Sequence, residues 1–155
     1  MLVGFIIKNV EVGMPTGSCL CGGVKFTVEG QLAPIQICHC VQCRKAQGTA
    51  LVTNIPVEET AFKIQSGNEQ LAFFESSPGK KRYFCKNCGS PIYSQTVKVP
   101  GVVRIRAGLL DGELETRAEK HFYVSDKANW FEMYDTLPKM TQGADSPEAD
   151  PQFEL

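Results

Sequence analysis

All seven cysteines of this chain fall into three short clusters. The clusters read Cys19-Leu-Cys21, Cys38-His-Cys40-Val-Gln-Cys43 and Cys85-Lys-Asn-Cys88. Cysteines separated by one or two residues can bind one metal ion from a single turn, so such pairs are typical of thiolate zinc sites. Two closed tetrahedral sites would need eight ligands, whereas seven cysteines fill one site and leave three ligands for another. The count therefore predicts two zinc ions, one closed and structural, the other with an open position for chemistry.

Glycine directly follows the last cysteine of the first and third clusters, at Gly22 and Gly89. Because glycine adopts positive φ, the backbone can curl so that N–H groups point at the thiolate sulfur. This shared feature pairs the two clusters as one four-cysteine site. The middle cluster has no glycine directly after it, and its three cysteines can bind one face of a metal and leave the opposite face free.

The middle site has a second interpretation, in which it is also closed. A fourth ligand from His39, from an acidic residue elsewhere or from a partner chain would make both sites structural. His39 could instead move a proton or orient a substrate beside the metal. Since both neighbours of His39 are candidate ligands, its ring is expected to point away from the metal, which leaves a supporting or packing role equally open.

The size and composition of the chain indicate one globular domain. It has 155 residues, of which 43% are apolar. No run approaches the length of about 20 apolar residues that a membrane span needs, and the run at 3–7 is far too short. The N-terminus lacks the features of a signal peptide, so the cytosol is expected, where clustered cysteines are more often metal ligands than disulfides.

Charge argues against a nucleic-acid partner. The formal charge is −1, and seven thiolates with two Zn²⁺ ions would bring it to −4. Basic residues nevertheless gather beside two clusters: Arg44 and Lys45 follow the middle one, and Lys80, Lys81 and Arg82 precede the third. These residues are either solvated and balance the thiolate charge, or they form a local site for a small anionic substrate.

Short strands punctuated by turns dominate the pattern, which favours a mainly β domain of antiparallel sheets. Residues 24–28 alternate apolar and polar side chains, as a half-buried strand does. Further predicted strands cover 51–55, 62–64, 71–74, 81–84, 91–94 and 102–105. Helix is scarce, with one turn expected over 41–46, ended by Gly48, and another over 126–134.

The remaining expectations concern the extent of the domain and single residues after position 110. A single domain is expected over 1–140, followed by a polar tail, 141–155, that is disordered or loosely draped. His121 lies in an apolar strand-like run and is expected in the core or in a hydrogen-bond network. Trp130 and Phe131 are expected in the core, with a substrate pocket as the alternative. Asp111 is interpreted as a turn residue.

Together these residues resemble the glutathione-dependent formaldehyde-activating enzyme family, which also includes the relatives of centromere protein V. The resemblance covers roughly residues 17–137, and the spacing CxC…CHCxxC…CxxCG is specific. The matching stretches are Gly17–Val24, Cys38–Lys45, Phe84–Ser90, Gly108–Asp111 and His121–Trp130.

The resemblance implies a mostly antiparallel fold of the β-tent type, similar to that of a small-GTPase exchange factor. It also implies carbon–sulfur lyase activity that joins glutathione and formaldehyde, although many members have no known substrate. One zinc is implied at Cys19, Cys21, Cys85 and Cys88, and a second, catalytic one at Cys38, Cys40 and Cys43.

An open zinc suits this chemistry, because a zinc-bound thiol is deprotonated and the metal can also polarise an aldehyde oxygen. Glutathione carries two carboxylates, so its site should place positive charge beside the metal. Arg44 and Lys45 follow the last middle-cluster cysteine and are the expected binding residues. The alternative function is a non-catalytic zinc module that binds glutathione or a protein partner.

Overall fold

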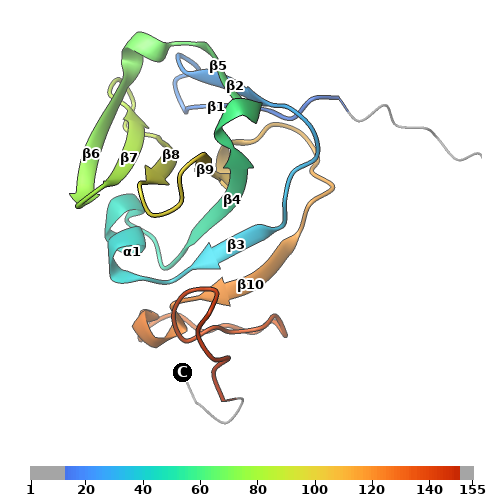
Figure 1. Cartoon of the computed structure of the whole chain (residues 1–155), viewed down its shortest axis with the longest axis vertical. Helices are drawn as coiled ribbons and strands as arrows, with labels where there is room; N and C mark the ends of the chain where they lie inside the picture. Colours follow the sequence, from blue (N-terminus) through green and yellow to red (C-terminus); the bar gives the residue numbers. More distant parts are fainter. Residues whose placement is uncertain (1–12, 151–155) are drawn as a thin grey trace, which may run out of the picture.

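The computed structural model describes residues 13–150, whose strands form two sheets (Figure 1). The smaller sheet has the order β1-β2-β5 and the larger one the order β10-β3-β4-β9-β8-β7-β6. The strands are β1 (Thr16–Ser18), β2 (Lys25–Val28), β3 (Ile35–Cys38), β4 (Val52–Glu58), β5 (Phe62–Ser66), β6 (Leu71–Ser77), β7 (Lys80–Cys85), β8 (Pro91–Thr96), β9 (Val102–Arg106) and β10 (Ala118–Phe122). Among these residues one α-helix occurs, α1 (Val41–Gln47), with 3-10 turns at Glu59–Ala61, Asn68–Gln70, Ala107–Leu109 and Val124–Asp126.

The core lies where one face of the larger sheet packs on the smaller sheet. Its buried side chains include Phe26 and Val28 of β2, Ile55 and Val57 of β4, and Val103 and Ile105 of β9. Burying an aliphatic side chain of this kind stabilises the fold by roughly 1.5–3 kcal/mol. Because alternate residues of a strand face opposite sides, Asn54, Arg104 and Arg106 point away from this core. The larger sheet therefore keeps a polar face.

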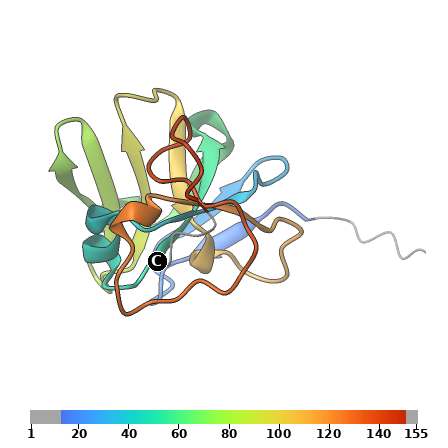
Figure 2. The same ribbon diagram turned by 90° about the horizontal axis from the view of Figure 1, so that it is seen from below.

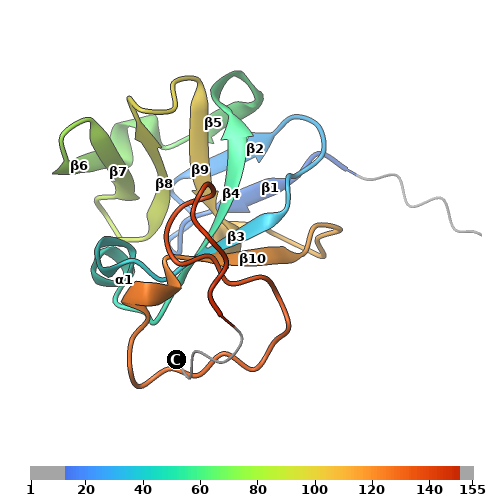
Figure 3. The same cartoon turned by 60° about the horizontal axis from the view of Figure 1, so that its bottom comes forward.

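The larger sheet bends so that its two ends approach the same helix. Figure 1 shows β3 and β10 turned away from β6, β7 and β8, and Figures 2 and 3 show α1 beneath the ends of β7 and β8. Contacts from Arg82 of β7 to Gln42 and Cys43 fix α1 in this place. The bend and the helix enclose part of the polar face.

The sequence-based prediction of a mainly β fold is confirmed, with one difference in strand direction. Each predicted strand occurs, and the neighbours in both sheets are antiparallel except β3 and β10, which pair in parallel. The predicted helix at 41–46 is α1, and it ends at Gly48, whose φ of 64° is left-handed. The apolar run at 3–7 lies outside the described residues.

The predicted helix over 126–134 is wrong. Beyond the 3-10 turn at Val124–Asp126 the chain is irregular, and Lys127 is extended with ψ of 140°. Trp130 is 69% exposed and Tyr134 is 91% exposed, so this segment has no continuous apolar stripe to bury. A short helix without such packing does not repay its nucleation cost. The core position expected for Trp130 is wrong for the same reason, whereas Phe131 is half-buried.

Residues 138–142 run parallel to the end of β10, and residues 147–149 fold back to pair with residues 139–141 (Figure 3). The N–H of Met140 donates to the carbonyl of His121, and the N–H of Tyr123 donates to that of Gln142. The polar segment from Thr141 therefore begins beside the end of β10 and then turns back on itself, and residues 151–155 fall outside the described range. No helix within 13–150 has the length and apolar character needed to cross a membrane.

Candidate functional site

Four cysteines that are far apart in the sequence converge where the two sheets meet. Their sulfur atoms all lie within 4.8 Å of one another, and we call this group the four-cysteine cluster: Cys19, Cys21, Cys85 and Cys88. Cys19 and Cys21 lie between β1 and β2, whereas Cys85 ends β7. The Sγ atoms of Cys19 and Cys21 are 3.5 Å apart, and those of Cys21 and Cys85 are 3.9 Å apart. Tetrahedral zinc with bonds of about 2.3 Å places sulfurs about 3.8 Å apart, so the group fits such an ion.

The turns around this cluster point donors at sulfur. Gly22 and Gly89 have φ of 72° and 77°, as the glycines after each pair predict. The N–H of Val24 donates to Cys19 Sγ at 3.2 Å. Hydrogen bonds from Ser90 lower the pKa of Cys88 to about 5, which favours its thiolate. Burial, by contrast, raises the pKa of Cys85 to about 11, so the donors favour thiolate at only part of the cluster.

The second group, the three-cysteine cluster, consists of Cys38, Cys40 and Cys43, with sulfur atoms within 4.8 Å of one another. Cys38 ends β3, Cys40 is the N-cap of α1, and Cys43 lies in its first turn. The N–H of Cys43 donates to Cys40 Sγ at 3.3 Å. Within residues 13–150, no fourth cysteine, histidine or carboxylate joins the group at this spacing.

His39 lies behind the three-cysteine cluster and does not line the cavity beside it. Its side chain is fully buried, and its Nε2 lies 2.8 Å from Nδ1 of His121. His121 Nε2 lies 3.0 Å from a carboxylate oxygen of Asp135. Burial, and then the neighbouring His121, lower the pKa of His39 to about 4. The network expected for His121 is present, and it connects the segment between two cluster cysteines to the surface.

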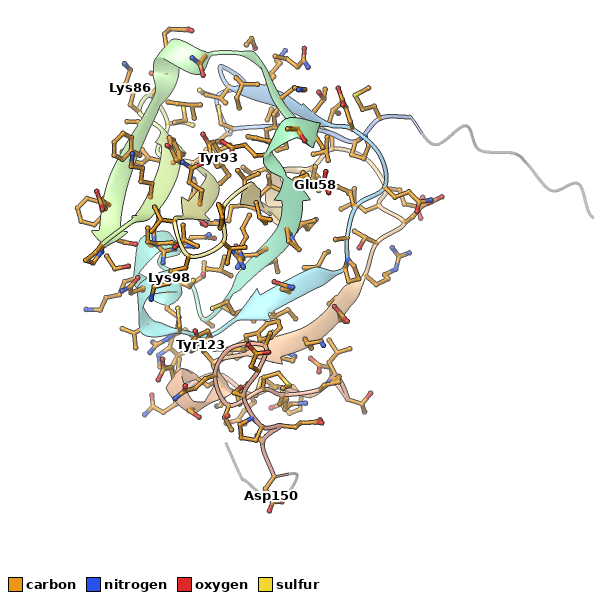
Figure 4. All side chains as sticks on the ribbon, in the orientation of Figure 1. Glu58, Lys86, Tyr93, Lys98, Tyr123 and Asp150 are labelled. Carbon is orange, nitrogen blue, oxygen red and sulfur yellow. The ribbon has the colours of Figure 1, made fainter. Side chains whose placement is uncertain are left out.

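A cavity of about 420 Å³ opens beside the three-cysteine cluster, on the polar face of the larger sheet. Four basic side chains line it, and we call it the basic cavity: Lys80, Arg82, Lys98 and Arg104. Arg82, Ser94 and Arg104 are register partners across β7, β8 and β9, which places them in one row. Lys98 enters from the turn between β8 and β9, and Tyr123 enters from the end of β10 (Figure 4). Gly143 and Ala144 complete the wall.

One of the four cations, Arg82, contacts the three-cysteine cluster directly. The guanidinium nitrogens of Arg82 lie 3.8 Å and 3.9 Å from Cys43 Sγ. Hydrogen bonds from Cys38 and Cys40 lower the pKa of Cys43, and Arg82 lowers it further. Burial, and then Arg104 and Arg82, lower the pKa of Lys80 to about 8. Within this cluster Cys43 is therefore the thiol whose surroundings favour thiolate, whereas hydrogen bonds with Cys40 and Cys43, and then burial, raise the pKa of Cys38. The pKa of Cys40 is also raised.

Arg106 supports this wall from inside the sheet. It is 5% exposed, and its Nη1 donates to Asn54 Oδ1 and to the carbonyl of Arg104 at 3.0 Å. Burial lowers the pKa of Arg106 to about 10. The contact occupies the amide oxygen of Asn54, so its N–H₂ group remains as a donor for the cavity.

The structure does not bring Arg44 and Lys45 to the cavity. Each helical residue is rotated by about 100° from the previous one, so residues after Cys43 leave the face that carries its sulfur. Arg44 Nε donates to the carbonyl of His39 at 3.3 Å, and Lys45 is exposed. Arg104 and Lys98 line the cavity although their positions in the sequence did not indicate a role in the site. The alternation of Val103, Arg104, Ile105 and Arg106 was the available signal for Arg104.

Tyr123 has φ of 57°, a left-handed conformation that no other non-glycine residue of 13–150 adopts. Such a conformation costs roughly 1–2 kcal/mol, and here the hydrogen bond from its N–H to Gln142 holds it. The Tyr123 side chain lines the cavity from this position. Burial, followed by the three nearby cysteines, raises the pKa of its hydroxyl.

A larger hollow of about 660 Å³ lies between the segment before β1 and residues 111–119. It contains no cysteine, and its acidic residues include Asp111, Glu113 and Glu115. Asp111 also accepts a hydrogen bond from Thr16 Oγ1 at 3.1 Å, consistent with its interpretation as a turn residue. Among residues 13–150 no cluster of candidate metal ligands lines this hollow, whereas three cysteines line the basic cavity, which is therefore the candidate site.

Comparison with known proteins agrees with this geometry. Residues 14–126 match the family model of the glutathione-dependent formaldehyde-activating enzyme. A Halomonas elongata protein, provisionally named as such an enzyme, is 29% identical over 126 residues, which span 76% of this chain and 79% of that protein. An uncharacterized lyase of Schizosaccharomyces pombe is 24% identical over 116 residues, 75% of this chain and 82% of that protein.

The fold also has a solved counterpart. The crystal structure of a Rhodobacter sphaeroides protein superimposes with a TM-score of 0.56 and 22% identity, and covers 66% of this chain and 98% of that one. The family match includes all seven cysteines and the basic side chains of the cavity. This chain therefore belongs to the glutathione-dependent formaldehyde-activating enzyme family.

Proposed function

We propose that the protein is a zinc-dependent carbon–sulfur lyase that acts on the adduct of a small thiol and an aldehyde. One observation carries the proposal: three cysteine sulfurs converge beside a basic cavity, and no fourth protein ligand joins them within the described residues. The family name supports a thiol substrate, with glutathione as the first candidate. The cytosol, where thiols stay reduced, is the expected setting.

The cofactor in this proposal is zinc, two ions per chain. The four-cysteine cluster would hold a structural ion, because its four sulfurs fit a closed tetrahedral site. Cys38, Cys40 and Cys43 would hold the second ion and leave one position open. An ion bound there supplies thiol acidification and a Lewis acid for a carbonyl oxygen.

The reaction forms or breaks one carbon–sulfur bond. In the forward direction the thiol sulfur attacks the aldehyde carbon, the C=O π electrons move to oxygen, and the proton lost by the thiol ends on that oxygen. Arg82 stabilises negative charge at the cluster, because its guanidinium lies beside Cys43 Sγ. The Tyr123 hydroxyl, at the rim, is a candidate to donate a hydrogen bond to the oxygen. His39 lies between Cys38 and Cys40 in the sequence, and its hydrogen bond to His121 anchors the backbone that carries both cysteines.

A non-catalytic zinc module that binds glutathione or a protein is the second candidate. A closed three-cysteine cluster, with its fourth ligand from a partner chain, would favour it. The open basic cavity beside this cluster supports the enzymatic candidate instead.

Calorimetry with glutathione and its S-methyl analogue tests thiol capture at the three-cysteine cluster. We expect zinc-loaded protein to bind glutathione more tightly, because the S-methyl analogue cannot form a thiolate. Turnover is followed in parallel by NMR of the thiol adduct. Equal affinity for both compounds, with no turnover, would contradict the lyase proposal and favour the binding module.

A further inference from the structure

The walls of the basic cavity carry cations without acidic partners. Four basic side chains line it, and among residues 13–150 no aspartate or glutamate belongs to its lining. None of the ion pairs formed within residues 13–150 involves Lys80, Arg82, Lys98 or Arg104. Cations that converge in a cavity without counter-charge are unfavourable unless an anion joins them. The cavity therefore favours a ligand that carries negative charge.

The cysteines account for only part of that charge. Three thiolates around one divalent ion leave a single negative charge, which four lining cations exceed by three. Arg82 is the cation beside this cluster, because it contacts Cys43 Sγ. Lys80, Lys98 and Arg104 therefore remain for other parts of a ligand.

These cations are spread around the cavity. Arg104 stands two strands from Arg82, with Ser94 between them, so their backbones are about 10 Å apart. Lys80 lies two residues along β7, about 7 Å from Arg82, and Lys98 comes from a separate turn. Backbones spaced in this way allow two separate carboxylates to be bound by different members of the set.

The cavity also disfavours a ligand ammonium group. An ammonium has three N–H donors and no acceptor, so it needs carboxylate or carbonyl partners when water is removed. Within the described lining no carboxylate is present, and the amide oxygens of Asn54 and Gln42 already accept hydrogen bonds from arginine side chains. A ligand ammonium would therefore meet only neutral oxygens there, such as those of Gln36, Ser77, Ser94 and Thr96. Glutathione brings such an ammonium together with its two carboxylates.

We propose that the basic cavity selects a small thiol with two carboxylates and no ammonium group. This inference rests on the proposed function, in which the thiol binds at the three-cysteine cluster. The carboxylates then bind Lys80, Lys98 and Arg104, and arginine offers them a paired-donor geometry. The natural thiol ligand of this chain thus carries more net negative charge than glutathione.

A panel of thiols titrated calorimetrically into the zinc-loaded full chain tests the inference. The probes are mercaptosuccinate with two carboxylates, glutathione, neutral 2-mercaptoethanol and cationic cysteamine. We expect mercaptosuccinate to bind at least about tenfold more tightly than 2-mercaptoethanol and more tightly than glutathione, with cysteamine weakest. Affinities of mercaptosuccinate and 2-mercaptoethanol within threefold of each other would overturn the inference.

Single substitutions test which side chains bind the carboxylates. Arg104→Gln and Lys98→Gln should each weaken mercaptosuccinate by about fivefold or more and leave 2-mercaptoethanol unchanged. Lys45→Gln is the matched control, because Lys45 is an exposed lysine that does not line the cavity. Lys98 is also exposed, so its variant keeps the test usable if Arg104→Gln fails to fold. Equal losses in the Lys45 and Lys98 variants would refute the assignment.

Two sulfur-free probes separate this inference from the proposed function. Succinate should bind weakly and lose affinity in Arg104→Gln; if the added thiol of mercaptosuccinate contributes nothing, the lyase proposal fails while the cavity assignment stands. Zinc-dependent binding of all thiols with equal affinity would keep the lyase proposal and remove this inference. Inorganic phosphate that binds more tightly than succinate would overturn the choice of two carboxylates.

Discussion

The residue with the least obvious role is His121, which connects the three-cysteine cluster to the surface. Its ring lies between His39 and Asp135, and it is almost fully buried. His121→Leu leaves His39 Nε2 without a partner in the interior, so we expect a loss of about 1–3 kcal/mol in the free energy of unfolding. Urea denaturation of the zinc-loaded protein measures this loss.

Asp135→Asn provides the control for this network. Asparagine keeps an oxygen that can accept from His121, and the Asp135 side chain is 44% exposed, so the expected loss is below about 1 kcal/mol. A His121→Leu protein as stable as wild type would show that the network does not support the fold.

Lys80 should make anion binding depend on pH. Its pKa is lowered to about 8 by burial and by Arg104 and Arg82, with Arg106 acting in the same direction and Cys43 opposing it. Lys80 is charged below pH 8 and neutral above it, so succinate affinity should be full near pH 7 and fall as pH rises through 8. Bound succinate stabilises the charged form and moves the midpoint somewhat higher.

Calorimetry between pH 7 and 9.5 measures this profile, with succinate fully ionised throughout. In Lys80→Arg the affinity should stay flat, because arginine does not lose its charge in this range. A profile that falls equally in wild type and Lys80→Arg would assign the titration to another group.

At the scale of elements, the two clusters join different parts of the fold. The four-cysteine cluster connects the β1–β2 turn of the smaller sheet to the end of β7 in the larger one, whereas the three-cysteine cluster lies within β3 and α1. Cys88→Ser should therefore cause gross destabilisation or insolubility, because the metal closes a long loop. Cys40→Ser should stay folded with one zinc and lose activity.

Circular dichroism and zinc analysis of the two purified variants check this contrast. If both proteins unfold equally, the division into a structural and a reactive site is wrong.

The elements also show how far the sequence alone could go. The spacing of the cysteines and the glycines that follow them predicted both groupings, because two ligands in one turn need a short spacing and a backbone that curls around the metal. The period of the apolar residues predicted strands. The segment 126–134 failed, since its helical character depended on packing that Trp130 and Tyr134 do not make. Arg44 was chosen by adjacency in sequence, whereas Arg104 reaches the site through strand register. Which residues become neighbours in a sheet depends on how distant strands pair, and the spacing of residues along the sequence does not reveal that pairing.

At the scale of the whole molecule, one sheet serves two purposes. Its inner face forms the core with the smaller sheet, and its outer face, bent around α1, forms the basic cavity. Residues 143–144 close one side of that cavity from a segment late in the chain. The architecture thus places seven thiols in two groups, one between the sheets and one at the cavity.

The central claim is that the three-cysteine cluster holds a metal with an open position for a thiol. Cadmium-113 NMR of the cadmium-substituted protein gives each metal its own resonance. The account predicts two resonances, of which the one lost in Cys40→Ser also shifts when mercaptosuccinate is added, while the other stays fixed. A single resonance, or two resonances whose chemical shifts do not change when mercaptosuccinate is added, would contradict this claim.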